Sequence, residues 1–399
     1  MCRITAWEME NASIEKTSYR KDLRSLPQDE LTRELAAAGY PRFRAEQVYR
    51  WLHVQLVQEI DEMTNLPKEM RMYLREHYIL SNLKTADRQI SRIDGTQKFL
   101  FELPDNETVE SVYMKYHYGS SVCVSSQVGC RMGCRFCASA VGGLVRGLLP
   151  GEMLEEVYMI RRMPAIDGVP DPACSLAGSS AADPASGKPE RISHVVVMGT
   201  GEPFDNYEHV VTFLRMLTDP GGLNLSARNI TVSTCGIVPR IYDFAKEDLP
   251  VTLALSLHAV TDEKRRKIMP IANRYSIDEC VEACRFYAKE TGRRVTFEYS
   301  LIRGVNDSGE DARLLAGLAK RVGGDASVAA HVNLIPVNPV TESAFRQPDS
   351  TSVRAFAAKL EKRGINVSIR RALGRDIDGA CGQLRRRHAD NASFGADNA

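Results

Sequence analysis

The chain has 399 residues, of which 43% are hydrophobic and 26% are charged, and its formal net charge is +1. This composition predicts a globular protein with one large domain and a smaller one. It excludes a polycation, so any RNA-binding surface must be local. The acidic N-terminus lacks a signal-peptide pattern and no stretch reaches the length of a membrane span, so we expect a cytoplasmic protein with no membrane partner. Ten cysteines in such a chain indicate metal binding or catalysis, because the cytosol keeps thiols reduced.

The N-terminal part of the chain is expected to be helical. Residues 22–90 carry apolar side chains at helical spacing, interrupted at Pro41 and Pro67. From Gln97 onward the pattern changes to short runs of β type, separated by Gly, Asn and Asp. We therefore place an N-terminal helical accessory domain at residues 1–95.

Strands and helices alternate through the rest of the chain. Further strands are expected at 192–199, 229–235, 251–258, 295–302, 327–336 and 366–371, and helices at 151–163, 207–217, 277–290, 311–322 and 352–364. This order predicts an α/β fold with a parallel sheet, forming a full or partial βα (TIM-like) barrel over residues 96–385. The aperiodic stretch at about 166–188 is expected to be a disordered insertion, with an ordered lid as the alternative, and residues 386–399 a polar tail.

Three closely spaced cysteines form the strongest local motif. Cys130, Cys134 and Cys137 follow a predicted strand with C-x3-C-x2-C spacing. A [4Fe–4S] cluster normally takes four thiolates, so three leave one iron open to a small ligand such as S-adenosylmethionine (SAM). The alternative is a zinc site that uses Cys123 or His117 as its fourth ligand.

Small or polar residues stand at the ends of four predicted strands. They are Thr200-Gly201-Glu202-Pro203, Ser233-Thr234, Leu257-His258 and Asn338. In a βα barrel the carboxyl ends of the strands carry the functional residues. Their joint occurrence beside the cysteine loop predicts a cofactor site.

At this point the sequence resembles a known family. The segments CVSSQVGC, RMGC and RFC, the Gly-Glu-Pro turn, SLHA and DIDGACGQL are similar to the radical SAM RNA adenine methyltransferases of the RlmN/Cfr family. The resemblance extends from about Leu31 to Arg385 and includes FRAEQVYRWL and EMTNLP in the helical region. Val128, where Cfr-like sequences tend to carry another cysteine, and Pro203 favour methylation of adenine C2, as in RlmN, over methylation of C8.

The resemblance implies the cofactors and their ligands. It implies that Cys130, Cys134 and Cys137 hold a [4Fe–4S] cluster and that two SAM molecules are used per turnover. SAM contacts are assigned to Gly201, Glu202, Ser233, Ser256, Leu257, His258 and Asn338.

The resemblance also implies the catalytic residues and partners. Cys381 becomes the methyl-carrying cysteine, Cys123 its partner in a transient disulfide, and Glu110 the proton acceptor. The implied substrates are an adenine in the peptidyl-transferase region of 23S rRNA and, in some members, the adenine beside the tRNA anticodon. A flavodoxin or ferredoxin is the expected electron donor, and a monomer the expected state.

RNA contact by particular residues is a separate hypothesis. Aromatic and basic groups interleave at Tyr40, Arg42, Arg44, Arg50 and Trp51, and basic groups follow at Arg385, Arg386 and Arg387. They suit phosphate contact and base stacking, although an amphipathic surface helix explains the first set equally well. Two other functions stay open at this point: a radical SAM enzyme of another kind, for which Cys123 and Cys381 would have no use, and a zinc-stabilised RNA-binding protein.

Overall fold

The computed structural model describes residues 20–116, 118–163, 192–323, 330–336, 345–371, 373–377 and 382–388. Of the features predicted from the sequence, His117, Asn338, Cys381, the stretch 166–188 and the tail from residue 389 lie outside the described residues. Among the described helices, none is both long enough and apolar enough to cross a bilayer.

The N-terminal region is helical up to residue 77, as predicted. Its helices are η1 (Leu23–Ser25), α2 (Gln28–Ala37), α3 (Arg42–His53), η2 (Ile60–Glu62) and α4 (Lys68–His77). The three α-helices each begin directly after a proline, namely Pro27, Pro41 and Pro67. A proline has no N–H to lose at a helix start, and its fixed φ favours the entry of the chain. A short parallel pair of strands, β1 (Lys21–Asp22) and β2 (Tyr78–Ile79), joins the two ends of the region.

The helical prediction for residues 84–90 was wrong. These residues form strand β3 (Lys84–Ile90), which pairs antiparallel with β4 (Gln97–Glu102). None of its side chains is buried, so the strand lacks the apolar alternation by which a strand is recognised. Its place in the sheet comes from backbone pairing with β4.

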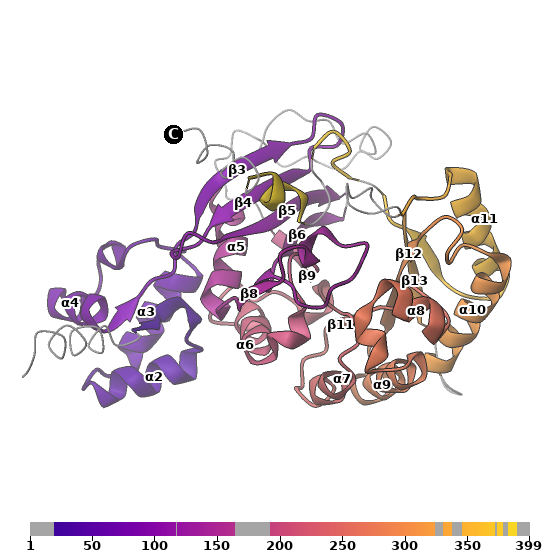
Figure 1. The fold of residues 1–399 in the computed structure, drawn as a ribbon. Coiled ribbons are helices and arrows are strands. Elements are labelled where there is room, and N and C mark those ends of the chain that lie inside the picture. The colour runs from indigo at the N-terminus through magenta and orange to yellow at the C-terminus, as the bar shows by residue number, and fades with distance from the viewer. Residues whose placement is uncertain are drawn as a thin grey trace, which may run out of the picture.

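A ten-stranded sheet forms the centre of the molecule (Figure 1). Its order is β14-β13-β12-β11-β10-β9-β6-β5-β4-β3. The remaining strands are β5 (Thr108–Tyr116), β6 (Gly119–Val124), β9 (Ile192–Val197), β10 (Ile230–Thr234), β11 (Thr252–Ser256), β12 (Val295–Leu301), β13 (His331–Pro336) and β14 (Val367–Ile369). Strands β6 and β9 to β14 run parallel, whereas β3 to β5 form an antiparallel extension. The described sheet is open at β14 and β3, so the barrel is partial.

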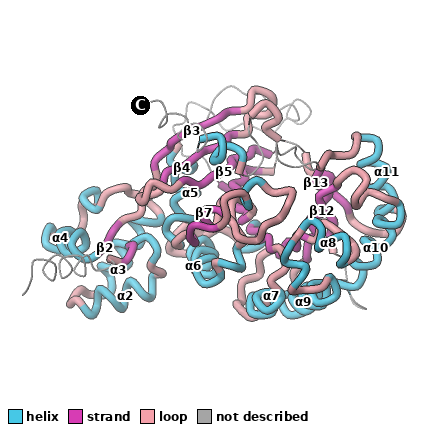
Figure 2. The backbone as a smooth tube through the Cα atoms, viewed as in Figure 1, coloured by secondary structure: helices cyan, strands magenta, loops and turns pink. Residues whose placement is uncertain are grey.

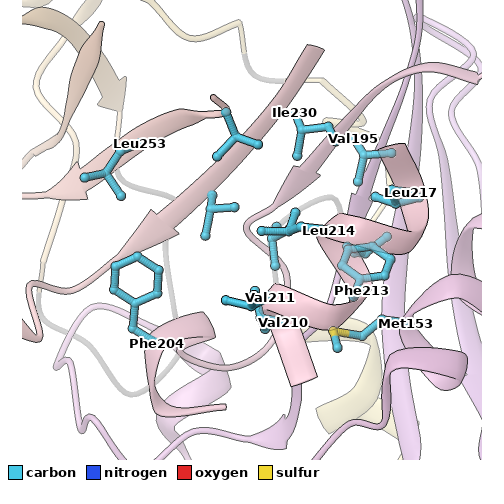
Figure 3. Packing of buried hydrophobic residues seen from close by; sticks show 14 of the residues in the cluster. Met153, Val195, Phe204, Val210, Val211, Phe213, Leu214, Leu217, Ile230 and Leu253 are labelled. Carbon is cyan, nitrogen blue, oxygen red and sulfur yellow. The ribbon is translucent and has the colours of Figure 1, made fainter. Parts of the chain in front are cut away.

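Helices cover the outside of the parallel strands (Figure 2). They are α5 (Pro150–Arg162), α6 (Tyr207–Thr218), α7 (Val238–Phe244), α8 (Asp262–Ile268), α9 (Ile277–Thr291), α10 (Gly309–Gly323) and α11 (Ser350–Glu361). In Figure 3, Phe213 and Leu214 of α6 pack near Val195 of β9 and Ile230 of β10. The two seven-residue helices α7 and α8 were not predicted, because two turns are too short to show a clear apolar period.

A buried charged network joins the helical region to the barrel. Arg24 contacts Glu155 of α5 with Nη1 2.5 Å from Oε2, and both side chains are fully buried. Arg162 contacts the other oxygen of Glu155 at 2.6 Å and donates to the Leu56 carbonyl. One hydrophobic cluster also runs from Leu23 through the barrel. The N-terminal helices are therefore packed onto α5 as part of a continuous core.

Candidate active site

The cysteine loop is held by a small hairpin of its own. Strands β7 (Gln127–Gly129) and β8 (Leu144–Gly147) pair antiparallel on either side of it. Gly129 has φ +77° and lies so close to Gly143 that a Cβ would be 2.0 Å from the Gly143 carbonyl oxygen. The Cys130 N–H donates to this same carbonyl at 2.8 Å. Only glycine fits at position 129, and its close approach fixes where the loop begins.

The three thiols lie near one another in a largely buried setting. Burial raises the pKa of Cys130 to about 12, and the neighbouring Cys137 raises it as well. Burial also raises the pKa of Cys134, to which both other cysteines contribute. Thiolates in such a place need a positive partner, which iron or zinc would supply.

The donor set of the loop fits a cluster with one open iron. Its three cysteines come from one short loop, and they lie close enough to act on one another electrostatically. A [4Fe–4S] cluster normally takes four thiolates, so three leave one iron position to another ligand. The residues present therefore fit a three-cysteine cluster.

The Gly-Glu-Pro turn lies directly against this hairpin. Gly201 has φ +112°, and a Cβ there would lie 2.7 Å from atoms of Ser126 and Gln127. The Gln127 side chain accepts from the Glu202 N–H at 2.8 Å. The buried Glu202 carboxylate accepts from the Cys235 N–H at 2.7 Å, and burial raises the pKa of Glu202. Glu202 is thus fixed beside the cysteine loop.

The ends of β10 and β11 meet at the same side. The hydroxyls of Ser233 and Ser256 are 3.3 Å apart, and both side chains are partly exposed. Leu257 is fully buried, and its N–H donates to the Glu298 carbonyl. Its carbonyl accepts from Arg265 Nε at 3.2 Å, so both backbone groups of Leu257 are held within the protein.

His258 is neutral and has a defined tautomer. Its Nδ1 accepts from the Ser300 N–H at 2.9 Å, so the proton is on Nε2. Burial lowers the pKa of His258 to about 3, and Arg265 lowers it further. The ring meets Phe136 of the cysteine loop edge to face, with centroids 4.8 Å apart. His258 therefore links the β11 end to the cysteine loop and carries its proton on Nε2.

Comparisons with known proteins agree with this geometry. A model of the ribosomal RNA large subunit methyltransferase N-terminal domain matches residues 21–80, and one of the radical SAM superfamily matches residues 185–316. A protein of Lachnospira eligens named "Probable dual-specificity RNA methyltransferase RlmN" is 50% identical over 370 residues, covering 93% of this chain and 97% of that protein. A protein of the same name from Staphylococcus epidermidis is 45% identical over 382 residues, covering 96% and 97%.

The chain belongs to the RlmN family of radical SAM RNA methyltransferases. A solved structure supports the fold: a radical SAM methyltransferase from Sphaerobacter thermophilus is 41% identical, with a TM-score of 0.78, covering 91% of this chain and 98% of that one. The predicted family, the α/β radical SAM fold with its N-terminal domain, and the enzyme class are confirmed. A zinc-stabilised non-enzyme and a radical SAM enzyme of an unrelated kind are both excluded.

The residue to which the family resemblance assigns proton acceptance, Glu110, lies in a buried polar contact. Its carboxylate is 3.0 Å from the Lys98 ammonium, and both side chains are at most 3% exposed. It accepts from the backbone N–H groups of Gly382, at 2.5 Å, and Arg385, at 2.7 Å. The segment that follows Cys381 is therefore tied to β5, as Figure 1 shows for the short yellow helix at residues 383–388.

Gly382 links this segment to the cysteine loop. It has φ +82°, and a Cβ there would lie 2.7 Å from the Ser139 nitrogen. Ser139 is two residues beyond Cys137. Cys123, the other residue of the predicted thiol pair, lies on β6, 3% exposed and opposite Val112 of β5. The structure thus brings Glu110, Cys123 and Gly382 to the cysteine side of the sheet; Cys381 and Asn338 lie outside the described residues.

Several residues of the site were missed in the sequence. Lys98 stands in the predicted strand QKFLFEL among buried residues, and a lysine in such a run signals a buried partner of opposite charge on the next strand. Arg265, fully buried, donates to the carbonyls of Cys235 and Leu257. Asn306 donates to the His258 carbonyl at 2.7 Å. The last two stand in loop or short-helix segments without a pattern that marks them.

Proposed function

We propose that this protein methylates C2 of an adenine in 23S rRNA, adenosine 2503, and adenosine 37 of some tRNAs, through an S-methyl intermediate on Cys381 and with two SAM molecules per turnover. The observation that carries the proposal is the position of Gly382, the neighbour of Cys381. Its N–H contacts Glu110 and its Cα lies against Ser139 beside the cysteine loop. The names of the relatives, which describe dual-specificity RNA methyltransferases, support two RNA substrates.

The chemistry of the base explains why such residues are needed. Adenine C2 lies between two ring nitrogens and is electron-poor, so it does not attack the methyl group of SAM. With the cluster bound, one-electron cleavage of SAM supplies a carbon radical that can abstract hydrogen from a methyl group. A protein thiol that first carries the methyl group then brings the carbon to the base without requiring a nucleophilic ring carbon.

Three side chains have distinct tasks in this scheme. The Cys381 thiolate displaces S-adenosylhomocysteine from the first SAM and so takes its methyl group. After the methylene carbon has bonded to C2, Glu110 accepts the C2 proton. The adduct gives up its unpaired electron to the external electron carrier. The Cys123 thiolate attacks the Cys381 sulfur, so that a disulfide forms and the carbon–sulfur bond breaks; the released carbon keeps the electron pair of that bond and takes up a proton to become the methyl group. An external electron donor of the flavodoxin or ferredoxin type then reduces this disulfide and supplies the electrons for SAM cleavage.

The N-terminal helices are the proposed RNA-binding surface. Arg42 and Arg50 of α3 are exposed, and the Trp51 indole N–H donates to Asn65 at the edge of the same region. Exposed arginines suit phosphate contact, and a half-exposed aromatic ring suits base stacking. Arg386 and Arg387 lie within the segment that follows Cys381, and we expect them to contact the same RNA. We place the enzyme in the cytoplasm, where these RNAs are made, and expect it to act as a monomer.

Nucleoside mass spectrometry tests the proposal. Digests of 23S rRNA and tRNA from cells with and without this gene are compared, and the deletion is complemented with wild type, Cys381→Ala or Cys284→Ala. Cys284 is buried in α9 and controls for loss of a thiol. We expect 2-methyladenosine to vanish on deletion and to return with wild type and Cys284→Ala only. Loss of 8-methyladenosine instead would assign the Cfr-type reaction, and no change in either nucleoside would overturn the proposal.

A further inference from the structure

A fully buried carboxyl group that the proposed reaction does not use lies behind the sheet at the site. Glu156 of α5 is 0% exposed. Its Oε2 contacts the Ser111 hydroxyl and accepts from the Ser125 N–H at 3.0 Å. Its other oxygen, Oε1, is buried and has no hydrogen-bonding partner in the described part of the chain. A buried polar group with an unpartnered oxygen is costly, so its presence calls for a reason beyond packing.

The two groups that contact Glu156 belong to the strands that carry the proposed catalytic residues. Ser111 directly follows Glu110 on β5, and Ser125 stands two residues after Cys123, just beyond β6. Neighbouring side chains of a strand point to opposite faces of the sheet. Glu156 therefore contacts the back of the sheet, on the side of α5, whereas Glu110 faces the front. Cys123 lies on the same face as Glu110, because its cross-strand partner stands two residues after Glu110.

Ser125 extends this contact to the strand that leads into the Gly-Glu-Pro turn. Its hydroxyl donates to the Glu110 carbonyl at 2.8 Å and accepts from the Thr200 N–H at 3.0 Å. A Cβ at Gly199 would lie 2.8 Å from the same hydroxyl. The backbone is thus packed tightly around Ser125, and a shift of this residue would move the neighbouring ends of β5, β6 and β9 together.

Glu156 holds these strands as a neutral acid. Burial raises the pKa of Glu156 well above 4.5, against the contacts with Ser111 and Ser125, and Glu152 raises it further. No cationic side chain of the described residues is paired with it. A neutral carboxyl group offers one donor and one acceptor side, as the amide of glutamine does. Glutamine should therefore replace Glu156, whereas leucine of similar size should not.

We propose that Glu156 is a positioning residue for product release: from the back of the sheet it holds Glu110 and Cys123 in place. The inference rests on the proposed function, in which the base stays bonded to Cys381 until Glu110 and Cys123 have acted. The earlier bonding of the methylene carbon to the base requires neither of these two side chains. A variant that lets them shift should therefore slow release and leave bonding to the base intact.

A single-turnover reaction of the cluster-loaded enzyme with a 23S rRNA fragment tests this role. After denaturation, gel electrophoresis measures RNA covalently bound to the protein, and mass spectrometry measures 2-methyladenosine. Wild type is compared with Glu156→Leu, Glu156→Gln, Ser111→Ala and Asp311→Asn. Ser111→Ala removes a single contact and keeps the test valid if Glu156→Leu does not fold. Asp311 is a buried carboxylate paired with Lys264 and Ser308, and its variant controls for a loss of stability.

The expected result is a change in the ratio of bound RNA to product. Glu156→Leu should raise this ratio by roughly ten- to a hundredfold, because a displaced catalytic group slows its step. Ser111→Ala should raise it by roughly two- to tenfold, because one hydrogen bond is lost. Glu156→Gln and Asp311→Asn should keep the wild-type ratio. Hydrogen exchange of the peptide 119–126, which contains the Ser125 N–H, should be faster in Glu156→Leu and unchanged in Glu156→Gln.

Three outcomes would overturn the inference. A wild-type ratio in both Glu156→Leu and Ser111→Ala, even if bound RNA and product fall together, would show that Glu156 only stabilises the fold. An equally raised ratio in Asp311→Asn would show that any loss of stability has this effect. Failure of Glu156→Gln to keep the wild-type ratio would show that the group does not act as a neutral acid. A wild type that forms no 2-methyladenosine would instead refute the proposed function itself, with which the inference falls.

Discussion

The buried ion pair between Arg24 and Glu155 gives the sharpest prediction about stability. The two groups are 2.5 Å apart and fully buried, which corresponds to an attraction of about 6.6 kcal/mol at an effective dielectric constant of 20. Burial nevertheless lowers the pKa of Arg24 and raises that of Glu155, so desolvation outweighs the attraction for each group. Glu155→Gln removes the attraction but leaves Arg24 buried. We expect the free energy of unfolding to fall by about 3–5 kcal/mol.

The same reasoning predicts that the double variant behaves differently. In Arg24→Met/Glu155→Leu neither charge is desolvated, so much of the lost stability should return. Arg162, which is 19% exposed at its side chain, can turn its charge toward solvent. Urea denaturation followed by circular dichroism measures all variants. Glu247→Gln, which breaks a partly exposed pair with Arg215, is the control and should cost at most about 1 kcal/mol. A loss below about 1 kcal/mol for Glu155→Gln, or a double variant no more stable than Glu155→Gln, would refute the reasoning.

Three further predictions concern the site. Gly382→Ala places a Cβ 2.7 Å from the Ser139 nitrogen at φ +82° and should displace the segment around it. Methylation should fall at least about tenfold, and trypsin should cut faster at Arg385–Arg387. The affinity for SAM should be unchanged, which shows that the effect is confined to this segment. Lys98→Met leaves the Glu110 carboxylate buried without its ammonium partner and should cost about 3–5 kcal/mol in urea denaturation, part of which Lys98→Met/Glu110→Gln should restore. Burial raises the pKa of Glu298 from 4.5 to about 6, against the effects of Arg370 and Asn333. The carboxyl therefore contributes stability that is present below pH 4.5 and lost as pH rises through 6, so Glu298→Gln should gain about 2 kcal/mol over wild type between pH 4.5 and pH 7.

The sequence predicted those parts of the fold that local patterns encode. The βα alternation from residue 97 onward is correct because buried parallel strands such as Leu253–Leu255 are continuous apolar runs, and α9 and α10 have a full apolar face. Strand β3 was missed because backbone hydrogen bonds to β4, and not side-chain burial, hold it in the sheet. The C-x3-C-x2-C loop was recognisable because its ligands are close in sequence. Its spacing alone could not separate iron from zinc; the family to which the chain belongs implies the iron–sulfur cluster.

The contacts of Glu110 could not be predicted, because they depend on pairing between distant segments. Glu110 meets Gly382 across 272 residues of sequence and Lys98 across one strand pairing. Nothing in VESVYM distinguishes its glutamate from an exposed strand carboxylate. Only the antiparallel pairing of β4 and β5 turns Lys98 and Glu110 to one face and buries them together.

The same pairing explains what the antiparallel extension does for the enzyme. Besides Glu110, the turn between β3 and β4 holds the C-terminal segment: the Asp94 carboxylate accepts from the Gly374 N–H at 2.9 Å, and Asp376 accepts from the Ser91 hydroxyl at 2.6 Å. Asp94 and Ser91 thus hold the segment 373–377, before residue 381, and Glu110 holds the segment 382–388, after it. The barrel strands hold the cysteine loop and the expected SAM contacts, whereas β3 to β5 hold the ends of the segment to which the methyl-carrying role is assigned. Substitutions at Asp94 or Ser91 should therefore lower methyl transfer without changing SAM affinity, in contrast to substitutions at Ser233 or Ser256.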